Sequence, residues 1–349
     1  MAKPDLHIDL DAVIANWRAL DRMSSAAVET GAVVKADAYG LGAGQVARAL
    51  AGAGVRNFFT ATADEGAELR RALGPGPTIS VFAGHMAGDA EAIGGAQLVP
   101  MLNSLDQLTL HFEALPGAPF GIQLDTGMNR LGLEAAEWEA AAGIVLEAGP
   151  TLLMSHLACS DEPQHPMNIF QCEEFMRLTE DTGVPRSLSA TGGILLGPEF
   201  HFELVRPGIG LHGCAPFDQG RKPLRLSLPV IQIREIHAGE TVGYSNTFIA
   251  ESSMLVATVS AGYADGLLRS LSGRAHLWQG LVPCPILGRV SMDLITVDVT
   301  HLADTPTHLD MLGEKQSADD LAAVAGTIGY EILTGLSPRY RRVYHGGAA

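Results

Sequence analysis

The sequence predicts an α/β protein in which an N-terminal (β/α)₈ TIM-like barrel is followed by a mostly β C-terminal domain. Over about 200 residues, eight short apolar runs alternate with helix-like stretches, which is the pattern of such a barrel. The stretch 213–223 is rich in glycine and proline, and after it strand follows strand almost without helices. We expect a barrel domain over residues 11–220 and a β-rich domain that combines residues 1–10 with 221–349.

Each expected barrel strand is a short apolar run that ends in turn residues. The eight runs are 32–36, 57–62, 78–83, 98–103, 120–125, 152–157, 187–190 and 204–211. The helix-like stretches between them are 43–53, 64–73, 104–115, 135–147 and 169–182, and the weakest helical pattern lies near Leu195. In such a barrel the side chains that do chemistry lie at the carboxyl ends of the strands.

The second half of the chain reads as a β domain with one helix. Its expected strands are 229–236, 241–250, 254–261, 275–279, 286–290 and 294–299, and its helix is 317–325. The opening strand, 6–10, precedes the barrel, and we expect it to join this second domain.

Composition and charge exclude several classes of protein. No apolar run approaches the roughly 18 residues that span a bilayer, and the charged start is unlike a signal peptide, so we expect a cytoplasmic protein. A net charge of -16 disfavours nucleic acid as a partner. The four cysteines lie singly, without the spacing of a zinc site or a disulfide framework, and we expect no metal.

Lys35 is the strongest candidate for a reactive residue. It ends the apolar run 32–36, just before a glycine-rich turn that contains Tyr39. Burial at this point would lower the pKa of the amine from its usual value of about 10.4. An unprotonated amine is a nucleophile that forms Schiff bases with aldehydes, whereas most lysines at strand ends are simply solvated.

Polar residues stand at the downstream ends of five expected strands, which would place them together at one mouth of the barrel. They are Lys35, Asp125, His156, Ser189 and Arg206. Taken singly, His156 could be a hydrogen-bonded core histidine and Asp125 a turn residue. Ser189 and the Gly208-Ile209 pair follow the seventh and eighth strands, where barrels commonly bind phosphate. A phosphate site beside a desolvated lysine suggests pyridoxal phosphate as cofactor.

Seven motifs give the chain a resemblance to the pyridoxal-phosphate-dependent alanine racemases over nearly its whole length. In the expected barrel they are A-V-V-K-A-D-A-Y-G at 32–40, L-D-T-G-M-N-R-L-G at 124–132, S-H-L-A at 155–158 and V-R-P-G-I at 205–209. In the expected β domain they are V-G-Y at 242–244, G-Y-A-D-G at 262–266 and G-R-V-S-M-D at 288–293. The barrel motifs alone would indicate only a wider class of pyridoxal enzymes, and the β-domain motifs are more specific.

The resemblance implies two-base racemisation of alanine, which supplies D-alanine for cell-wall peptidoglycan, by a homodimer with shared active sites. Lys35 would hold the cofactor and act as base on one face of Cα, and Tyr244 of the partner subunit would be the base on the other. Tyr39, Ser189, Gly208 and Ile209 would bind the phosphate. The remaining implied roles are His156 packing on the ring, Arg206 donating to its nitrogen, and Arg130 lying near the substrate carboxylate and the ring hydroxyl. Met292, through its backbone N–H, and Tyr263 would contact the carboxylate from the partner subunit.

The chain departs from that family at three positions. Gln123 stands where many relatives have a lysine that is often carbamylated, so we expect no carbamylation here and a neutral amide that can bond to Arg130. Leu188 replaces an asparagine before the phosphate-binding serine. Pro338 occupies the position of a C-terminal tyrosine that touches the phosphate, and we assign that contact to Tyr340.

Other functions remain open on the sequence alone. A decarboxylase of the same two-domain plan would usually carry a glycine-rich phosphate loop and a G-P-x-C motif, and neither is found. A racemase of serine, of basic amino acids or of broad specificity is harder to exclude. A non-enzymatic pyridoxal-phosphate homeostasis protein would be a bare barrel, which the β domain argues against. Tyr244 itself could be a strand aromatic packed in a core.

Overall fold

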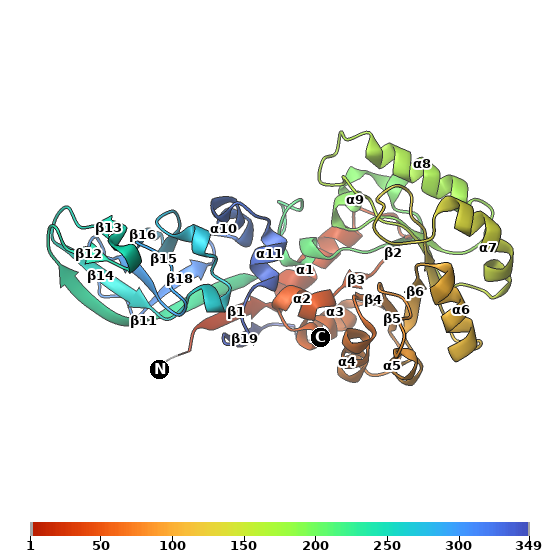
Figure 1. Ribbon diagram of the computed structural model, residues 1–349, viewed down its shortest axis with the longest axis horizontal. Coiled ribbons are helices and arrows are strands. Elements are labelled where there is room, and N and C mark those ends of the chain that lie inside the picture. The colour runs from red at the N-terminus through yellow and green to blue at the C-terminus, as the bar shows by residue number, and fades with distance from the viewer. Residues whose placement is uncertain (1–2, 348–349) are drawn as a thin grey trace. The chain divides into compact units, whose positions relative to one another are not determined.

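The computed structural model describes residues 3–347, which form two compact units (Figure 1). One unit is Val13–Gly220. The other combines the described residues up to Ala12 with Arg221–Gly346. Among the described residues, no helix is both long and apolar enough to cross a membrane.

The first unit is a parallel barrel. Seven strands pair in chain order: β3 (Ala32–Val33), β4 (Asn57–Thr60), β5 (Thr78–Val81), β6 (Val99–Leu102), β7 (Gly121–Gln123), β8 (Leu153–Met154) and β9 (Arg186–Ser187). The eighth, β10 (Leu204–Val205), pairs in parallel with β2 (Glu29–Thr30), which only Gly31 separates from β3. Backbone bonds from Glu203 N–H to Arg186 O (3.1 Å) and from Arg206 N–H to Ser189 O (2.8 Å) join β10 to β9. Backbone hydrogen bonds therefore run around the whole ring, and the predicted barrel is confirmed.

Helices cover the outside of this barrel (Figure 1). They are α1 (Leu10–Asp21), α3 (Ala43–Ala53), α4 (Ala63–Leu73), α5 (Ala90–Ala96), α6 (Leu105–Ala114), α7 (Ala135–Glu147), α8 (Met167–Thr179) and α9 (Thr191–Leu196). A cluster of buried residues that includes Ile122, Leu153 and Phe175 packs α7 and α8 against the strands. Burial of each such side chain stabilises the fold by about 1.5–3 kcal/mol. The helix α1 was not predicted although it carries Leu10, Val13 and Trp17, and α5 was not predicted because most of its residues are alanine and glycine.

The strands end earlier than the sequence predicts. The expected runs 32–36, 187–190 and 204–211 shorten to Ala32–Val33, Arg186–Ser187 and Leu204–Val205. Ser189 and Arg206, expected within strands, therefore lie in the loops that follow. The apolar sequence continues past the strand ends into buried loop positions such as Ile209 and Leu211, so apolar residues alone predict strands that are too long.

The second unit is built on an eight-stranded sheet, in the order β14-β17-β16-β15-β18-β11-β1-β19 with an additional β14–β11 pairing that closes six strands into a ring. Its strands are β1 (Asp5–Asp9), β11 (Leu224–Ile236), β14 (Met254–Val259), β15 (His276–Gln279), β16 (Val282–Leu287), β17 (Ile295–Asp298), β18 (His308–Leu312) and β19 (Arg341–His345). Buried and partly exposed residues alternate along β1 and β17, as expected for strands with one face on a core. The helices are α10 (Ala318–Ala325) and α11 (Gly329–Thr334).

The expected strand 241–250 is wrong in its middle. The structure has a short hairpin, β12 (Thr241–Val242) and β13 (Phe248–Ile249), joined by the 3₁₀ turn η3 (Tyr244–Asn246). Ser245 and Asn246 have φ values of 62° and 48°, in the left-handed region that ends a strand. Tyr244 is 70 % exposed, so the alternative of a core aromatic is also wrong.

Candidate active site

Basic side chains gather at the carboxyl ends of the barrel strands. Lys35 follows β3, His156 follows β8 and Arg206 follows β10. Burial first, and then the positive charges of Arg206, Arg130 and Lys35, lower the pKa of His156 to about 3. His156 is therefore a neutral imidazole at physiological pH, and these four groups lie within electrostatic reach of one another.

The Lys35 amine lies in a desolvated, electropositive place. Burial is the larger cause that lowers its pKa, and the charge of Arg130 lowers it further, while Glu65 acts in the opposite direction. Its Nζ lies 5.7 Å from the centre of the Phe82 ring. A depressed pKa makes the free base available nearer neutrality, which is what a nucleophilic lysine or a general base requires.

The segment that carries Lys35 has an unusual backbone. Directly after Lys35, the residues Ala36, Asp37, Ala38 and Tyr39 have φ values between 51° and 58°, so α2 (Lys35–Gly40) is a left-handed turn. Each such non-glycine residue costs about 1–2 kcal/mol. The turn brings the Tyr39 ring, which is 5 % exposed, against His212 and toward Gly208.

The loop after β10 forms a cradle for a small anion. A Cβ at Gly208 would overlap the hydroxyl of Tyr39, so any larger residue would force the Tyr39 ring to move. The N–H groups of Gly208 and Gly210 both donate to Thr191 Oγ1 at 3.2 Å, which fixes the loop. Ile209 begins the 3₁₀ helix η2 (Ile209–His212), and the N–H groups of a first helical turn are those the helix itself does not use. Because the Gly208 N–H already donates to Thr191 Oγ1, the phosphate contacts predicted for Tyr39, Gly208 and Ile209 stay predictions.

Ser189 lies beside this cradle but is engaged. Its hydroxyl is fully buried and donates to Phe200 O at 2.7 Å. To donate to a phosphate, the hydroxyl must rotate away from that carbonyl, so its predicted contact stays a prediction.

Arg206 is held in the barrel interior. It is 1 % exposed, its guanidinium donates to Ser187 Oγ, to Ser155 O at 2.7 Å and to Leu188 O at 3.3 Å, and burial lowers its pKa to about 9. The group is still a cation at neutral pH. With five N–H donors in all, it keeps donors for a further acceptor such as a ring nitrogen.

The side chains of Gln123 and Asp125 both form hydrogen bonds within the loop that follows β7. Gln123 is 5 % exposed, and its amide donates to Leu131 O at 2.9 Å rather than to the expected Arg130. Asp125 Oδ1 accepts from the N–H groups of Gly127 (2.8 Å) and Asn129 (3.2 Å), so Asp125 is the turn residue of the simpler interpretation. These bonds present Arg130, which is exposed, at the barrel mouth.

In the β unit, three predicted site residues are exposed. Tyr263 N–H donates to Ser291 O and Ala264 N–H to Met292 O, both at 3.0 Å, which places Tyr263 beside Met292. Their exposed fractions are 45 % for Tyr263 and 53 % for Met292, against 70 % for Tyr244. The sequence pattern did not reveal what supports them: Arg339 bridges Asp265 (3.2 Å) and Asp293 (2.8 Å), one on each of the two loops.

Tyr340 lies in the core of the β unit. It is 2 % exposed, and its buried hydroxyl makes no hydrogen bond with a described residue. Burial raises the pKa of this hydroxyl, so it stays protonated. The predicted contact with a phosphate stays a prediction for this residue.

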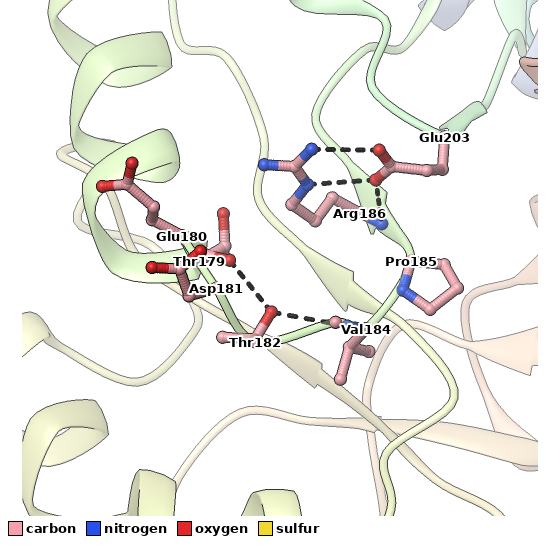
Figure 2. A pocket seen from close by; sticks show the side chains of 9 residues that line it. Thr179, Glu180, Asp181, Thr182, Val184, Pro185, Arg186 and Glu203 are labelled. Atoms are coloured by element: carbon pink, nitrogen blue, oxygen red, sulfur yellow. Dashed lines mark hydrogen bonds and ion pairs between the residues drawn. The ribbon is translucent and has the colours of Figure 1, made fainter.

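A pocket of about 480 Å³ opens elsewhere on the barrel, at the amino ends of β9 and β10. Figure 2 shows Arg186 facing Glu203, with which it makes two side-chain hydrogen bonds of 3.0 Å. That end of a barrel contributes to stability rather than to chemistry. The pocket carries none of the predicted site residues.

The fold agrees with what the chain is similar to. The family model described as "Alanine racemase, N-terminal domain" matches residues 8–216, and "Alanine racemase, C-terminal domain" matches residues 224–344. The chain belongs to the alanine racemase family. Alanine racemases of Cereibacter sphaeroides (strain ATCC 17029) and Dinoroseobacter shibae are 66 % and 63 % identical to it over 349 residues, covering 100 % of each chain.

Solved alanine racemase structures share its fold over nearly the whole chain. The enzyme of Bartonella henselae, with covalently bound pyridoxal phosphate, has a TM-score of 0.92 at 35 % identity and covers 99 % of this chain and 100 % of that one. The enzyme of D-cycloserine-producing Streptomyces lavendulae has a TM-score of 0.94 at 33 % identity, covering 100 % and 98 %.

His212 should make this alanine racemase family member sensitive to acid. It is 1 % exposed, neither ring nitrogen bonds to a described residue, and burial lowers its pKa to about 3. Between that value and the unfolded value of about 6.5, the unfolded chain binds a proton that the folded chain does not. The free energy of unfolding therefore falls as pH falls through this window, by about 1.4 kcal/mol per pH unit from this residue.

Urea unfolding at several pH values between 4.5 and 6.5 measures that slope. His212→Phe should reduce the slope by about 1.4 kcal/mol per pH unit, since the ring remains and the proton does not bind. His237→Gln is the control, because His237 is exposed. An unchanged slope in His212→Phe would show that His212 does not cause the acid sensitivity.

Proposed function

We propose that this protein interconverts L- and D-alanine with pyridoxal phosphate, using Lys35 and Tyr244 as the two bases. The observation that carries the proposal is the desolvated Lys35 amine, joined by a left-handed turn to Tyr39 at the Gly208 cradle. An aldehyde-reactive amine and an anion cradle on one rigid segment match the two ends of this cofactor. A cytoplasmic location remains a prediction from the sequence.

The residues of the barrel would bind and orient the cofactor. Tyr39, Gly208 and Ile209 would hold its phosphate, with Ser189 after rotation of its hydroxyl. His156, being neutral, would pack on the ring without adding charge, and Arg206 would donate an N–H to the ring nitrogen. Because Arg206 is still protonated at neutral pH, that nitrogen stays a hydrogen-bond acceptor. Bound pyridoxal phosphate supplies delocalisation of the negative charge left on Cα when its proton is removed.

Inversion at Cα requires a proton acceptor on one face and a donor on the other. Lys35 Nζ would serve one face, and the Oη of Tyr244 of the partner subunit would serve the other. Arg130, with the N–H of Met292 of the partner subunit and Tyr263 of the partner subunit, would hold the substrate carboxylate so that Cα–H stays aligned with the two bases. The resemblance, rather than a measured contact, supplies these roles.

A homodimer with shared sites is part of the proposal. Its support is the exposure of Tyr244, Tyr263 and Met292 together in the β unit, because large side chains left exposed in a group commonly mark an interaction surface. The D-alanine formed would serve as a precursor of cell-wall peptidoglycan.

Borohydride labelling tests the attachment of the cofactor. The chain has four lysines, Lys3, Lys35, Lys222 and Lys315, so the labelled peptide is assigned without ambiguity. We expect a visible absorption band that borohydride removes and a pyridoxyl label on Lys35, together with loss of optical rotation from L-alanine. A label on another lysine, or none, would refute the role of Lys35.

A further inference from the structure

The left-handed turn after Lys35 needs contacts that keep it folded. Four consecutive non-glycine residues at positive φ make this backbone unfavourable by several kcal/mol on the usual cost per residue. The turn sets the positions of the Lys35 side chain at one end and the Tyr39 ring at the other. Whatever holds the turn therefore also sets the distance between the amine and the anion cradle.

Glu65, in the first turn of α4, makes two hydrogen bonds that hold the left-handed turn in place. Its Oε1 accepts from Ala36 N–H at 2.9 Å, the first residue of the left-handed turn. Its Oε2 accepts from Ala61 N–H at 2.8 Å, directly after β4. The backbone N–H of Glu65 donates to Thr62 Oγ1 at 3.3 Å, so the residue that caps α4 also fixes Glu65 itself.

The geometry of these two hydrogen bonds requires a carboxylate at position 65. Two N–H donors converge on the two oxygens, and only a carboxylate offers two acceptors of this kind. A glutamine would accept one of the bonds and turn its own N–H₂ toward the other donor. Hydrogen bonds to a charged acceptor are also the stronger ones, roughly twice as strong as neutral pairs.

We propose that Glu65 is a positioning residue whose carboxylate ties the left-handed turn to the end of β4 and thereby sets where Lys35 Nζ and Tyr39 Oη lie. The chemical importance of those two atoms rests on the function proposed above. The hydrogen bonds of the Glu65 carboxylate do not depend on that function, because their donors are the backbone N–H groups of Ala36 and Ala61.

The charge of Glu65 has a second consequence for Lys35. Burial and Arg130 lower the pKa of the amine, and Glu65 opposes them. His156 and Arg206 are the other basic groups nearby, while Asp37 and Glu68 line the same pocket of about 390 Å³ as Glu65. Removing the charge of Glu65 moves the pKa of Lys35 further down, so the amine becomes reactive at lower pH.

Glu65→Gln and Glu68→Gln form a matched pair for the test. Both change one charge on α4 at the edge of the same pocket, but Glu68 is 75 % exposed and pairs with Arg71 rather than with the turn. The first measurement is amide hydrogen exchange of the full-length protein. We expect exchange in residues 32–43 to be about fivefold faster in Glu65→Gln, which corresponds to the loss of one hydrogen bond, and unchanged in Glu68→Gln.

The second measurement is the pH dependence of the rate at which the full-length protein, freed of cofactor, captures added pyridoxal phosphate. We expect the midpoint of this pH dependence to move to lower pH in Glu65→Gln and to stay unchanged in Glu68→Gln. If Glu65→Gln does not fold, Glu65→Asp replaces it. Its shorter carboxylate cannot span both N–H groups, so exchange should rise while the midpoint stays.

The outcomes separate this inference from the proposed function. If wild-type Lys35 carries the borohydride label but Glu65→Gln exchanges and captures cofactor like Glu68→Gln, the positioning role is wrong. If Lys35 carries no label, the proposed function fails, and the exchange data still decide whether Glu65 holds the turn.

Discussion

Replacing Lys35 with methionine should lower the rate of alanine racemisation by at least about a thousandfold, because one change removes both the covalent attachment of the cofactor and one base. Methionine has nearly the length of lysine and suits a desolvated site, so the barrel should stay folded. The rate is measured as loss of optical rotation from L-alanine, and separately from D-alanine. The visible band that borohydride removes should also be absent.

Lys315→Met is the control for this change, because Lys315 lies on the exposed side of a loop in the β unit beside Glu314. It should keep both the rate and the absorption band. A Lys35→Met enzyme within tenfold of wild type would exclude Lys35 as cofactor lysine and as base, whatever the control shows.

Replacing Tyr244 with phenylalanine should slow racemisation in both directions by about a hundredfold or more, because every turnover needs a proton acceptor and a donor on opposite faces. The ring remains and only Oη is lost. Tyr244 is 70 % exposed in its own unit, so the change should leave stability within about 0.5 kcal/mol. Rates from L- and D-alanine and a urea unfolding curve provide the measurements.

Mixing the two inactive variants then tests whether Tyr244 acts on a neighbouring chain. In a homodimer with shared sites, a mixed dimer of Lys35→Met and Tyr244→Phe contains one site with both bases intact. After random exchange of subunits, about a quarter of wild-type activity should return. No recovery, when the subunits are shown to exchange, would mean that Tyr244 serves the site of its own chain or none.

The barrel was predictable because its strands are short apolar runs whose spacing leaves room for one helix each. The helices 43–53 and 135–147 were predicted to the residue. The strand ends were not, since loop residues at the mouth, such as Leu157 and Ile209, are as apolar and as buried as strand residues. In the β domain, β18 and β19 were missed: the first four residues of His308–Leu312 alternate between polar and apolar, so β18 was readable, whereas Arg341–His345 does not alternate.

For the candidate site, the sequence predicted the chemically active residues but not the residues that hold them in place. Lys35, His156 and Arg206 interrupt apolar runs, so the sequence points to them. Glu65 and Thr191 begin helices and look like ordinary helix-start residues, yet they bond to segments far away in the chain. The left-handed turn at Ala36–Tyr39 was equally invisible, because alanine and tyrosine rarely adopt such φ values, and only the tertiary contacts impose them.

The closed ring of six strands in the β unit limits where another molecule could add a strand. Six of its strands have no free edge, and β1 and β19 extend the sheet so that β19 presents its outer edge. An unpaired edge can template the addition of a strand from another molecule. Arg341 and Arg342 lie on β19, and Arg341 makes two bonds of 2.7 Å to Asp5. Arginine side chains on an edge strand oppose edge-to-edge pairing, so we expect β19 to resist the addition of a strand from another molecule.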